Sequence, residues 1–250
     1  MFTAENTAHL QKNQLGEVIC QFRYPELLTI SANSPVEFQE AIRADYPQYQ
    51  KKLETPAGST QKTEPTVNHQ FASADGGWRV NLTGRFLSVY TGHYTDWDDF
   101  AGRLDAVLAA FIRIYRPAYF ERIGLRYLNF ISRRNLHLEG IPFSQLFQPC
   151  WLGPLAEADV SEQAVSRCTV DTEMAVRGGC RIKIHAGPGL VRQNGSEDKE
   201  VKFIFDQDVF MPGQVPCNLS TGALQTLHGQ AVQIFFSAIT DTLLEAMLRG

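Results

Sequence analysis

The sequence lacks any long hydrophobic run. Its longest apolar stretch covers seven residues, Ala106 to Ile112, whereas a membrane-spanning helix needs about 20. The first residues, MFTAENTAHLQKNQLG, contain no basic segment followed by an apolar core, so we expect no signal peptide. These two absences predict a cytoplasmic protein with no membrane partner.

Paired cysteines and catalytic motifs are also missing. The five cysteines are an odd number and include no C-x-x-C pair, so neither a disulfide framework nor a zinc ribbon is expected. The sequence contains no G-x-S-x-G, H-E-x-x-H, Walker A or G-x-G-x-x-G motif. These motifs would mark the commonest nucleophile, zinc and phosphate sites. We therefore expect no metal and no other cofactor, and we favour a protein that is not an enzyme.

Neither sign of charge dominates the chain. Its 250 residues include 23 Lys and Arg against 27 Asp and Glu, which gives a formal net charge of −4. Proteins that wrap nucleic acid need a net basic surface. The acidic balance therefore disfavours nucleic acid as a partner, although it leaves room for a local basic patch.

The first half of the chain begins with a strand and a helix. Residues 17–24, EVICQFRY, alternate between polar and apolar side chains as a half-buried strand does. The sequence Ser34-Pro35-Val36-Glu37 predicts a capping box at the start of a helix, which ends before Pro47. Residues 48–67 are polar and rich in turn-forming residues, so they predict a flexible loop.

Two turn sequences predict three strands after this loop. Asp75-Gly76 is typical of a type I′ hairpin turn, and Gly84-Arg85 fits a type II′ turn. Pairing across the first turn sets Phe71 opposite Val80, which keeps apolar side chains on one face. A helix between 95 and 117 then closes the first half.

The second half repeats this order of elements. The predicted elements are a strand at 122–129 (RIGLRYLN), a Pro-interrupted helical region at 141–163, strands near 166–176, 180–186, 189–193 and 200–206, and a helix at about 222–248. The order predicts an α+β fold of tandem β-α-β(3–4)-α repeats, which form one curved antiparallel sheet packed on long helices. Such an arrangement is similar to helix-grip and saddle-like folds. We expect residues 1–135 to form the first half and residues 136–250 the second, fused into one globular unit.

Both opening strands carry an arginine on their polar side. These are Arg23 and Arg126, which the repeat would relate by a pseudo-twofold axis; Arg122 shares the face of Arg126, and Arg79 stands on a neighbouring strand. A guanidinium on a rigid sheet can bind a carboxylate or a phosphate with two donors. The alternative is that each arginine pairs across strands with an acid such as Glu17.

A second group of charged residues lies in the hairpin over 166–186. A three-residue loop at 177–179 would set Glu173 opposite Lys183 and Asp171 opposite His185. Acidic side chains beside a lysine are found in metal-dependent hydrolases and nucleases, which makes this face an alternative catalytic site. A cross-strand ladder of ion pairs explains the same pattern without catalysis.

Several stretches are similar to an uncharacterised, sporadically distributed prokaryotic protein family of about 250 residues, the length of this chain. The matching stretches are EVICQFRY (17–24), SPVEFQEAIRADYPQY (34–49), GWRV (77–80), RIGLRYLN (122–129), GPL (153–155), and Leu227-His228 with Thr240-Asp241 in the last helix. The family has no established activity. Its patchy distribution is typical of antitoxins, immunity proteins and phage-defence accessory factors. Inside its motifs, the residues that look functional are Glu17, Gln21, Arg23, Arg126, Tyr127 and Asn129.

The leading hypothesis is a non-enzymatic binding protein that presents a polar sheet face to a protein partner or to an anionic small molecule. One alternative is a metal-dependent hydrolase or nuclease that uses Asp171, Glu173 and Lys183 with His185. A third hypothesis is a small-molecule pocket between the sheet and the last helix, lined by Phe235 and Ile239, because helix-grip domains often have such pockets.

Overall fold

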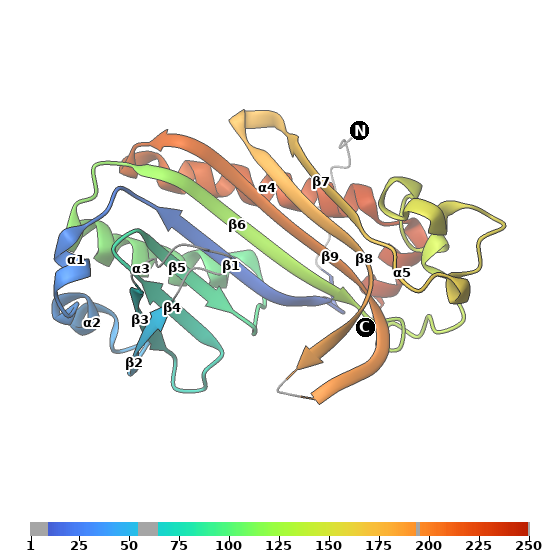
Figure 1. The fold of residues 1–250 in the computed structure, drawn as a ribbon, viewed down its shortest axis with the longest axis horizontal. Helices are drawn as coiled ribbons and strands as arrows, with labels where there is room; N and C mark the ends of the chain where they lie inside the picture. The colour runs from blue at the N-terminus through green and yellow to red at the C-terminus, as the bar shows by residue number, and fades with distance from the viewer. Residues whose placement is uncertain (1–9, 55–64, 194–195, 250) are drawn as a thin grey trace. The chain divides into compact units, whose positions relative to one another are not determined.

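The computed structural model describes residues 10–54, 65–193 and 196–249, and these form an α+β fold. The strands are β1 (Leu15–Arg23), β2 (Gln48–Glu54), β3 (Thr66–Ala72), β4 (Trp78–Leu82), β5 (Phe86–Thr91), β6 (Phe120–Ile131), β7 (Val170–Ala175), β8 (Arg181–Gln193) and β9 (Ser196–Val215). The α-helices are α1 (Leu28–Ala32), α2 (Val36–Ile42), α3 (Trp97–Tyr115), α4 (Ser220–Ala238) and α5 (Asp241–Leu248). Within the described residues the strands follow the order β2-β3-β4-β5-β1-β6-β9-β8-β7 in one sheet (Figure 1).

The chain forms two compact units that are built from separate stretches of sequence. The N-terminal unit consists of Glu17–Leu125 and Phe210–Gln225, and the C-terminal unit of Met1–Gly16, Arg126–Val209 and Thr226–Gly250. The sequence instead predicted one boundary after residue 135. The difference arises because β6, β9 and α4 each contribute residues to both units.

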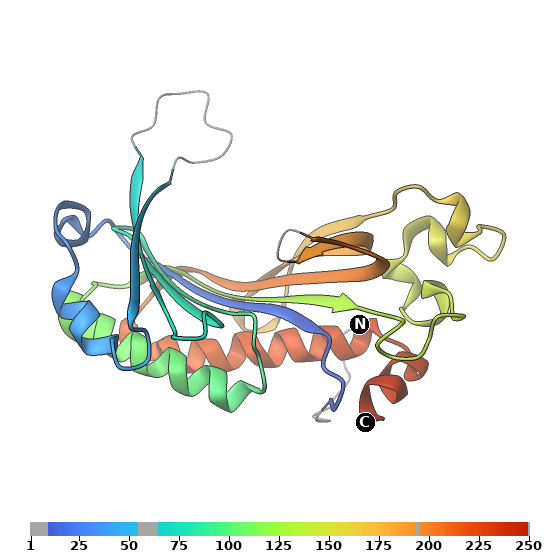
Figure 2. The ribbon, with the colours of Figure 1, turned by 90° about the horizontal axis from the view of Figure 1, so that it is seen from below.

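In the N-terminal unit, helices α2 and α3 pack on one face of the strands, and α3 lies along the strands in Figure 2. Trp78 of β4 stacks on Phe100 of α3 at 5.6 Å between ring centroids, and Phe38 of α2 meets Phe71 of β3 edge-on at the same distance. Helix α3 begins where the Asp96 carboxylate accepts a hydrogen bond from the Asp99 N–H. Its predicted apolar stripe is buried against the sheet.

The register of the two predicted hairpins of this unit is confirmed, but both predicted turn types are wrong. A type I′ turn needs a positive φ at Asp75 as well as at Gly76, and only Gly76 has one. A type II′ turn needs a positive φ at Gly84, which Gly84 does not have. Phe71 pairs with Val80 across the first turn, and Leu82 pairs with Leu87 across the second. In each hairpin a turn of small or polar residues fixes the register, and the apolar pairs then share the helix-covered face.

Two local predictions need correction. Residues 48–54, predicted as part of a flexible loop, form strand β2, and all seven of its residues are exposed. Of the rest of that predicted loop, residues 55–64 lie outside the described residues, and Thr66 and Val67 begin strand β3. The capping box expected at Ser34 is also absent, because α2 begins at Val36 after Pro35 and no side chain caps it.

In the C-terminal unit, helix α4 runs along one side of β6 and β9 (Figures 1 and 2). Aromatic rings fill the space between helix, strands and the 3₁₀ turns: Phe147 stacks on Phe203 at 3.9 Å, and Phe205 meets Phe235 edge-on at 6.1 Å. The predicted closing helix is two helices, because Thr240 starts α5 by accepting a hydrogen bond from the Leu243 N–H. The predicted strands at 180–186 and 189–193 are one strand, β8.

Among the described residues, the helices lack the combination of length and apolar character that a membrane span requires.

Candidate functional site

An open hollow of about 500 Å³ lies on the C-terminal unit, and most of its lining side chains are charged. It is lined by Arg126, Asp171, Thr172, Glu173, Lys183, Ile184, His185, Asp206 and Asp208. These residues come from β6, β7, β8 and β9. The hollow therefore joins Arg126 to the charged hairpin, two groups that the sequence analysis placed in separate candidate sites.

Arg126 is held by Asp206 of the neighbouring strand β9. Its Nε donates to Oδ1 at 2.7 Å and its Nη2 donates to Oδ2 at 2.5 Å. The Asp206 side chain is 16% exposed and that of Arg126 is 43% exposed. Bidentate pairing of this kind fixes the plane of the guanidinium and uses the donors that would otherwise bind a ligand carboxylate or phosphate.

The hairpin of β7 and β8 supplies Asp171, Thr172, Glu173, Lys183, Ile184 and His185 to the lining. Its predicted register is confirmed, with Asp171 opposite His185 and Glu173 opposite Lys183. His185 Nδ1 lies 2.6 Å from Asp171 Oδ1. Arg181 Nε donates to Glu173 at 3.0 Å, and Lys183 Nζ lies 3.5 Å from the same carboxylate. The hydrogen bond from Arg181, followed by the charge of Lys183, lowers the pKa of Glu173 below its ordinary value.

The hollow carries an excess of negative charge. Its lining includes four carboxylates but only two permanent cations, Arg126 and Lys183, so it is acidic when His185 is neutral. Acidic groups at the mouth of a hollow attract cationic groups from solution. Within residues 10–54, 65–193 and 196–249, no three His, Cys, Asp or Glu side chains are grouped so that they could hold a metal ion.

Tyr127 and Asn129, predicted to bind beside Arg126, lie on the other face of β6. The Tyr127 hydroxyl is 2.8 Å from Nδ1 of His228 on α4, and Asn129 Nδ2 donates to the Phe205 carbonyl at 3.1 Å. Both residues are buried. Because successive side chains of a strand point to opposite faces, neighbours of Arg126 in sequence cannot share its face.

The remaining predicted residues belong to the N-terminal unit. Arg23 is exposed, and its Nε donates to Gln21 at 2.9 Å. Arg79 covers the Tyr90 ring at 4.9 Å, and Arg122 covers the Phe210 ring at 4.5 Å. Burial and the nearby Glu17 carboxylate raise the pKa of Tyr90. These residues, Glu17 among them, belong to the N-terminal unit, whereas the residues that line the hollow belong to the C-terminal unit.

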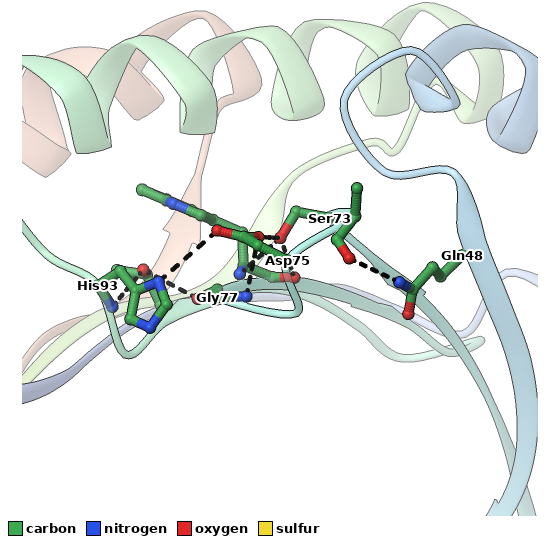
Figure 3. Close-up of polar contacts among 8 residues, drawn as sticks. Gln48, Ser73, Asp75, Gly77 and His93 are labelled. Carbon is green, nitrogen blue, oxygen red and sulfur yellow. Dashed lines mark hydrogen bonds and ion pairs between the residues drawn. The ribbon is translucent and has the colours of Figure 1, made fainter.

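A serine, an aspartate and a histidine meet at the β3–β4 turn of the N-terminal unit (Figure 3). Ser73 Oγ donates to Asp75 Oδ1 at 2.5 Å and accepts from the Trp78 N–H at 3.0 Å. His93 Nδ1 lies 3.7 Å from the other Asp75 oxygen. In a catalytic triad the histidine, not the carboxylate, accepts the serine proton. Here the carboxylate occupies that place and also accepts from the Gly77 N–H, so the group stabilises a turn.

The sequence analysis missed Asp206 and Asp208 as members of the hollow. The sequence FIFDQD at 203–208 does indicate their position, because Phe203 and Phe205 fall on one face of a strand and the two acids on the other. The predicted strand ended at residue 206 and so left out Asp208. An alternating strand places its acids on the face opposite the phenylalanines.

The chain matches no family model, and no curated protein is significantly similar to it.

Proposed function

We propose that the protein is a non-enzymatic binding protein and that the hollow of the C-terminal unit receives Lys or Arg side chains of a protein partner. The observation that supports this proposal is the charge of the hollow, whose lining contains four carboxylates and two permanent cations. A basic side chain placed there would replace part of its hydration with charge-assisted hydrogen bonds to fixed carboxylates. Complementary charge of this kind accelerates association and selects the partner.

The geometry favours a protein partner over the anionic ligand that was also expected. An anion would have to displace Asp206 from the Arg126 guanidinium, and it would enter beside three further carboxylates. The negative charge of the ligand and those of the carboxylates repel each other, and this repulsion is strongest at low ionic strength.

The test is titration of a fluorescent lysine- and arginine-rich peptide into the protein, with anisotropy as the readout. The double variant Asp171→Asn/Glu173→Gln removes two carboxylates from exposed positions of β7, where neither side chain supports the core. We expect the peptide to bind at least about tenfold more weakly to this variant at low salt.

The matched control is Glu40→Gln/Asp105→Asn. It makes the same charge change at exposed helix positions of the N-terminal unit. Equal weakening in both double variants would mean that only net charge matters and would overturn the proposal. So would failure of the unaltered protein to prefer the basic peptide over a glutamate-rich peptide of equal length.

A metal-dependent hydrolase remains the second candidate, because Asp171, Glu173, Lys183 and His185 do line one hollow. It ranks below binding because, among the described residues, no three His, Cys, Asp or Glu side chains are grouped so that they could hold a metal ion. Cleavage of a nucleic acid or phosphodiester substrate with Mg²⁺ or Mn²⁺, abolished in Asp171→Asn/Glu173→Gln, would reverse this order.

We also propose that the two halves of the chain arose by duplication and share a helix-grip-like plan. Support comes from the order of elements. The first half begins with β1, its last strand β5 lies beside β1, and helix α3 follows β5. The second half begins with β6, its last strand β9 lies beside β6, and helix α4 follows β9. A role as an antitoxin, immunity protein or phage-defence accessory factor rests on the family resemblance alone. The alternative small-molecule pocket at Phe235 and Ile239 has less support, because both side chains are buried in ring and helix contacts.

A further inference from the structure

The face of the N-terminal unit opposite α2 and α3 carries a row of uncharged polar side chains across five strands. The pairing registers connect them in order: Gln50 of β2, Gln70 of β3, Asn81 of β4, Ser88 of β5 and Gln21 of β1. Four of the five are carboxamides. Gln70 and Ser88 are buried, whereas Gln50, Asn81 and Gln21 are at least partly exposed. These three carboxamides offer donors and acceptors in fixed positions to the edges of bases.

Hydrogen bonds within the row hold these amides in place. Gln50 Nε2 donates to Gln70 Oε1 at 3.0 Å, and Asn81 Nδ2 donates to Ser88 Oγ at 3.1 Å. Beside the row, Asn68 Nδ2 donates to Glu54 at 2.7 Å, but the buried Asn68 Oδ1 accepts no hydrogen bond from the described residues. A buried acceptor without a donor lowers the stability of the free protein.

Aromatic and cationic side chains flank the row on both sides. On one side the Arg79 guanidinium covers the Tyr90 ring, and on the other side Phe86 pairs across strands with Arg23. Tyr90 and Phe86 are both half-buried. Aromatic rings on a sheet are stacking platforms for unpaired bases, whatever the base.

The charge of this face differs from that of the whole chain. Arg23, Arg79 and Lys52 outnumber Glu17 and Glu54 on it. Many of the unit's acids instead lie on the helices: Glu37, Glu40, Asp98, Asp99 and Asp105. On this count the face carries one more positive than negative charge, although the net charge of the chain is −4, and its cations can contact phosphates.

We propose that this face binds single-stranded nucleic acid. Bases stack on Phe86 and on the Arg79 guanidinium that covers the Tyr90 ring, Asn81 and its exposed neighbours contact their edges, and Arg23 and Lys52 contact phosphates. The residues of this face are different from those that line the acidic hollow, which belong to the other unit. Duplex nucleic acid does not fit this chemistry, because its bases are stacked on one another and cannot reach the rings.

The test is anisotropy with fluorescent oligouridine and oligothymidine of about 12 nucleotides, at low salt of about 50 mM. The variant is Tyr90→Leu/Arg79→Gln. Its matched control, Tyr119→Leu/Arg113→Gln, makes the same chemical changes at the C-terminal end of α3 and in the loop after it, outside the face. We expect the Tyr90 variant to bind at least about tenfold more weakly, since one lost stacking contact has an effect of this size. The control is expected to bind like the unaltered protein.

Further binding measurements decide which ligand this face binds. The same bases in duplex form should bind at least about tenfold more weakly than the single strand. Equal loss in the two double variants, or absence of measurable binding by the unaltered protein, would overturn the proposal. Tighter binding of a glutamate-rich peptide or a neutral oligosaccharide, with the same dependence on Tyr90, would assign the face to that ligand instead. The experiment with basic peptide and Asp171→Asn/Glu173→Gln tests only the hollow. Its outcome does not affect the interpretation of oligonucleotide binding to this face.

Discussion

Arg126 of β6 and Asp206 of β9 form a two-bonded ion pair at distances of 2.7 and 2.5 Å, although they are 80 residues apart in sequence. The pair ties two neighbouring strands of the C-terminal unit together. Because Asp206 is only 16% exposed, the pair belongs at the upper end of the range for surface ion pairs.

A double-mutant cycle with Arg126→Met and Asp206→Asn should therefore give a coupling free energy of about 1 kcal/mol, measured by urea unfolding. Methionine keeps most of the apolar stem of Arg126, and asparagine keeps the shape of Asp206. A coupling below about 0.3 kcal/mol would show that the pair is held by packing alone.

Gly187 and Gly189 of β8 provide a matched pair of backbone tests. A Cβ at Gly187 would lie 2.3 Å from the Cys168 carbonyl oxygen, and the φ of +156° is one that L residues rarely adopt. A Cβ at Gly189 would meet only the end of the Ile204 side chain, at 2.8 Å. We expect Gly187→Ala to destabilise by more than about 2 kcal/mol and Gly189→Ala by less than about 1 kcal/mol in thermal or urea unfolding. Equal losses would contradict this account.

His69 makes the N-terminal unit sensitive to acid. The residue is 2% exposed, its Nδ1 is 2.9 Å from the Tyr49 hydroxyl, and its Nε2 has no partner among the described residues. Burial, followed by the charge of Lys51, lowers its pKa from 6.5. The unfolded chain therefore takes up a proton that the folded chain resists, and stability falls as the pH drops through about 6.5 toward the lower folded pKa.

In His69→Phe, the drop in melting temperature between about pH 7.5 and about pH 5.5 should be smaller than in the unaltered protein. The control His137→Asn removes an exposed histidine at a positive φ of 57°, a conformation that asparagine tolerates. An unchanged drop in His69→Phe would show that His69 is not the titrating group.

Thr240 both ends the turn after α4 and starts α5. Its Oγ1 donates to the Gln145 carbonyl at 2.7 Å, and the Leu243 N–H donates to it. Thr240→Ala should lower the unfolding free energy by about 1 kcal/mol, whereas Thr240→Ser, which keeps the hydroxyl, should lose a few tenths. Similar losses in both variants would assign the effect to the methyl group.

Local sequence patterns predicted the register of the hairpins well, but they predicted the environment of individual residues less well. The position of the turn at Asp75-Gly76 and the pair Phe71–Val80 were predictable because a turn-forming sequence and apolar alternation agree there, but the predicted turn type is wrong. Strand β2 was not, because QYQKKLE has no apolar face to alternate. Its extended conformation depends on pairing with β3, which is a tertiary contact.

The candidate site was predictable only in parts. The pairs Asp171–His185 and Glu173–Lys183 followed from one hairpin, so sequence spacing was enough. The place of Arg126 depended on which strand lies beside β6, and β9 is far away in sequence. The partner Asp206, and with it the loss of free donors on Arg126, could therefore not be read from local pattern.

Strand β2 lies at one margin of the sheet, and Lys51 and Lys52 stand in its middle. Consecutive residues of a strand point to opposite faces, so the margin carries an ammonium group above and another below. A second molecule that approached edge to edge would bring the same groups against them. The repulsion between these lysines therefore opposes edge-to-edge association of β2 with a second molecule, although the backbone of β2 is extended.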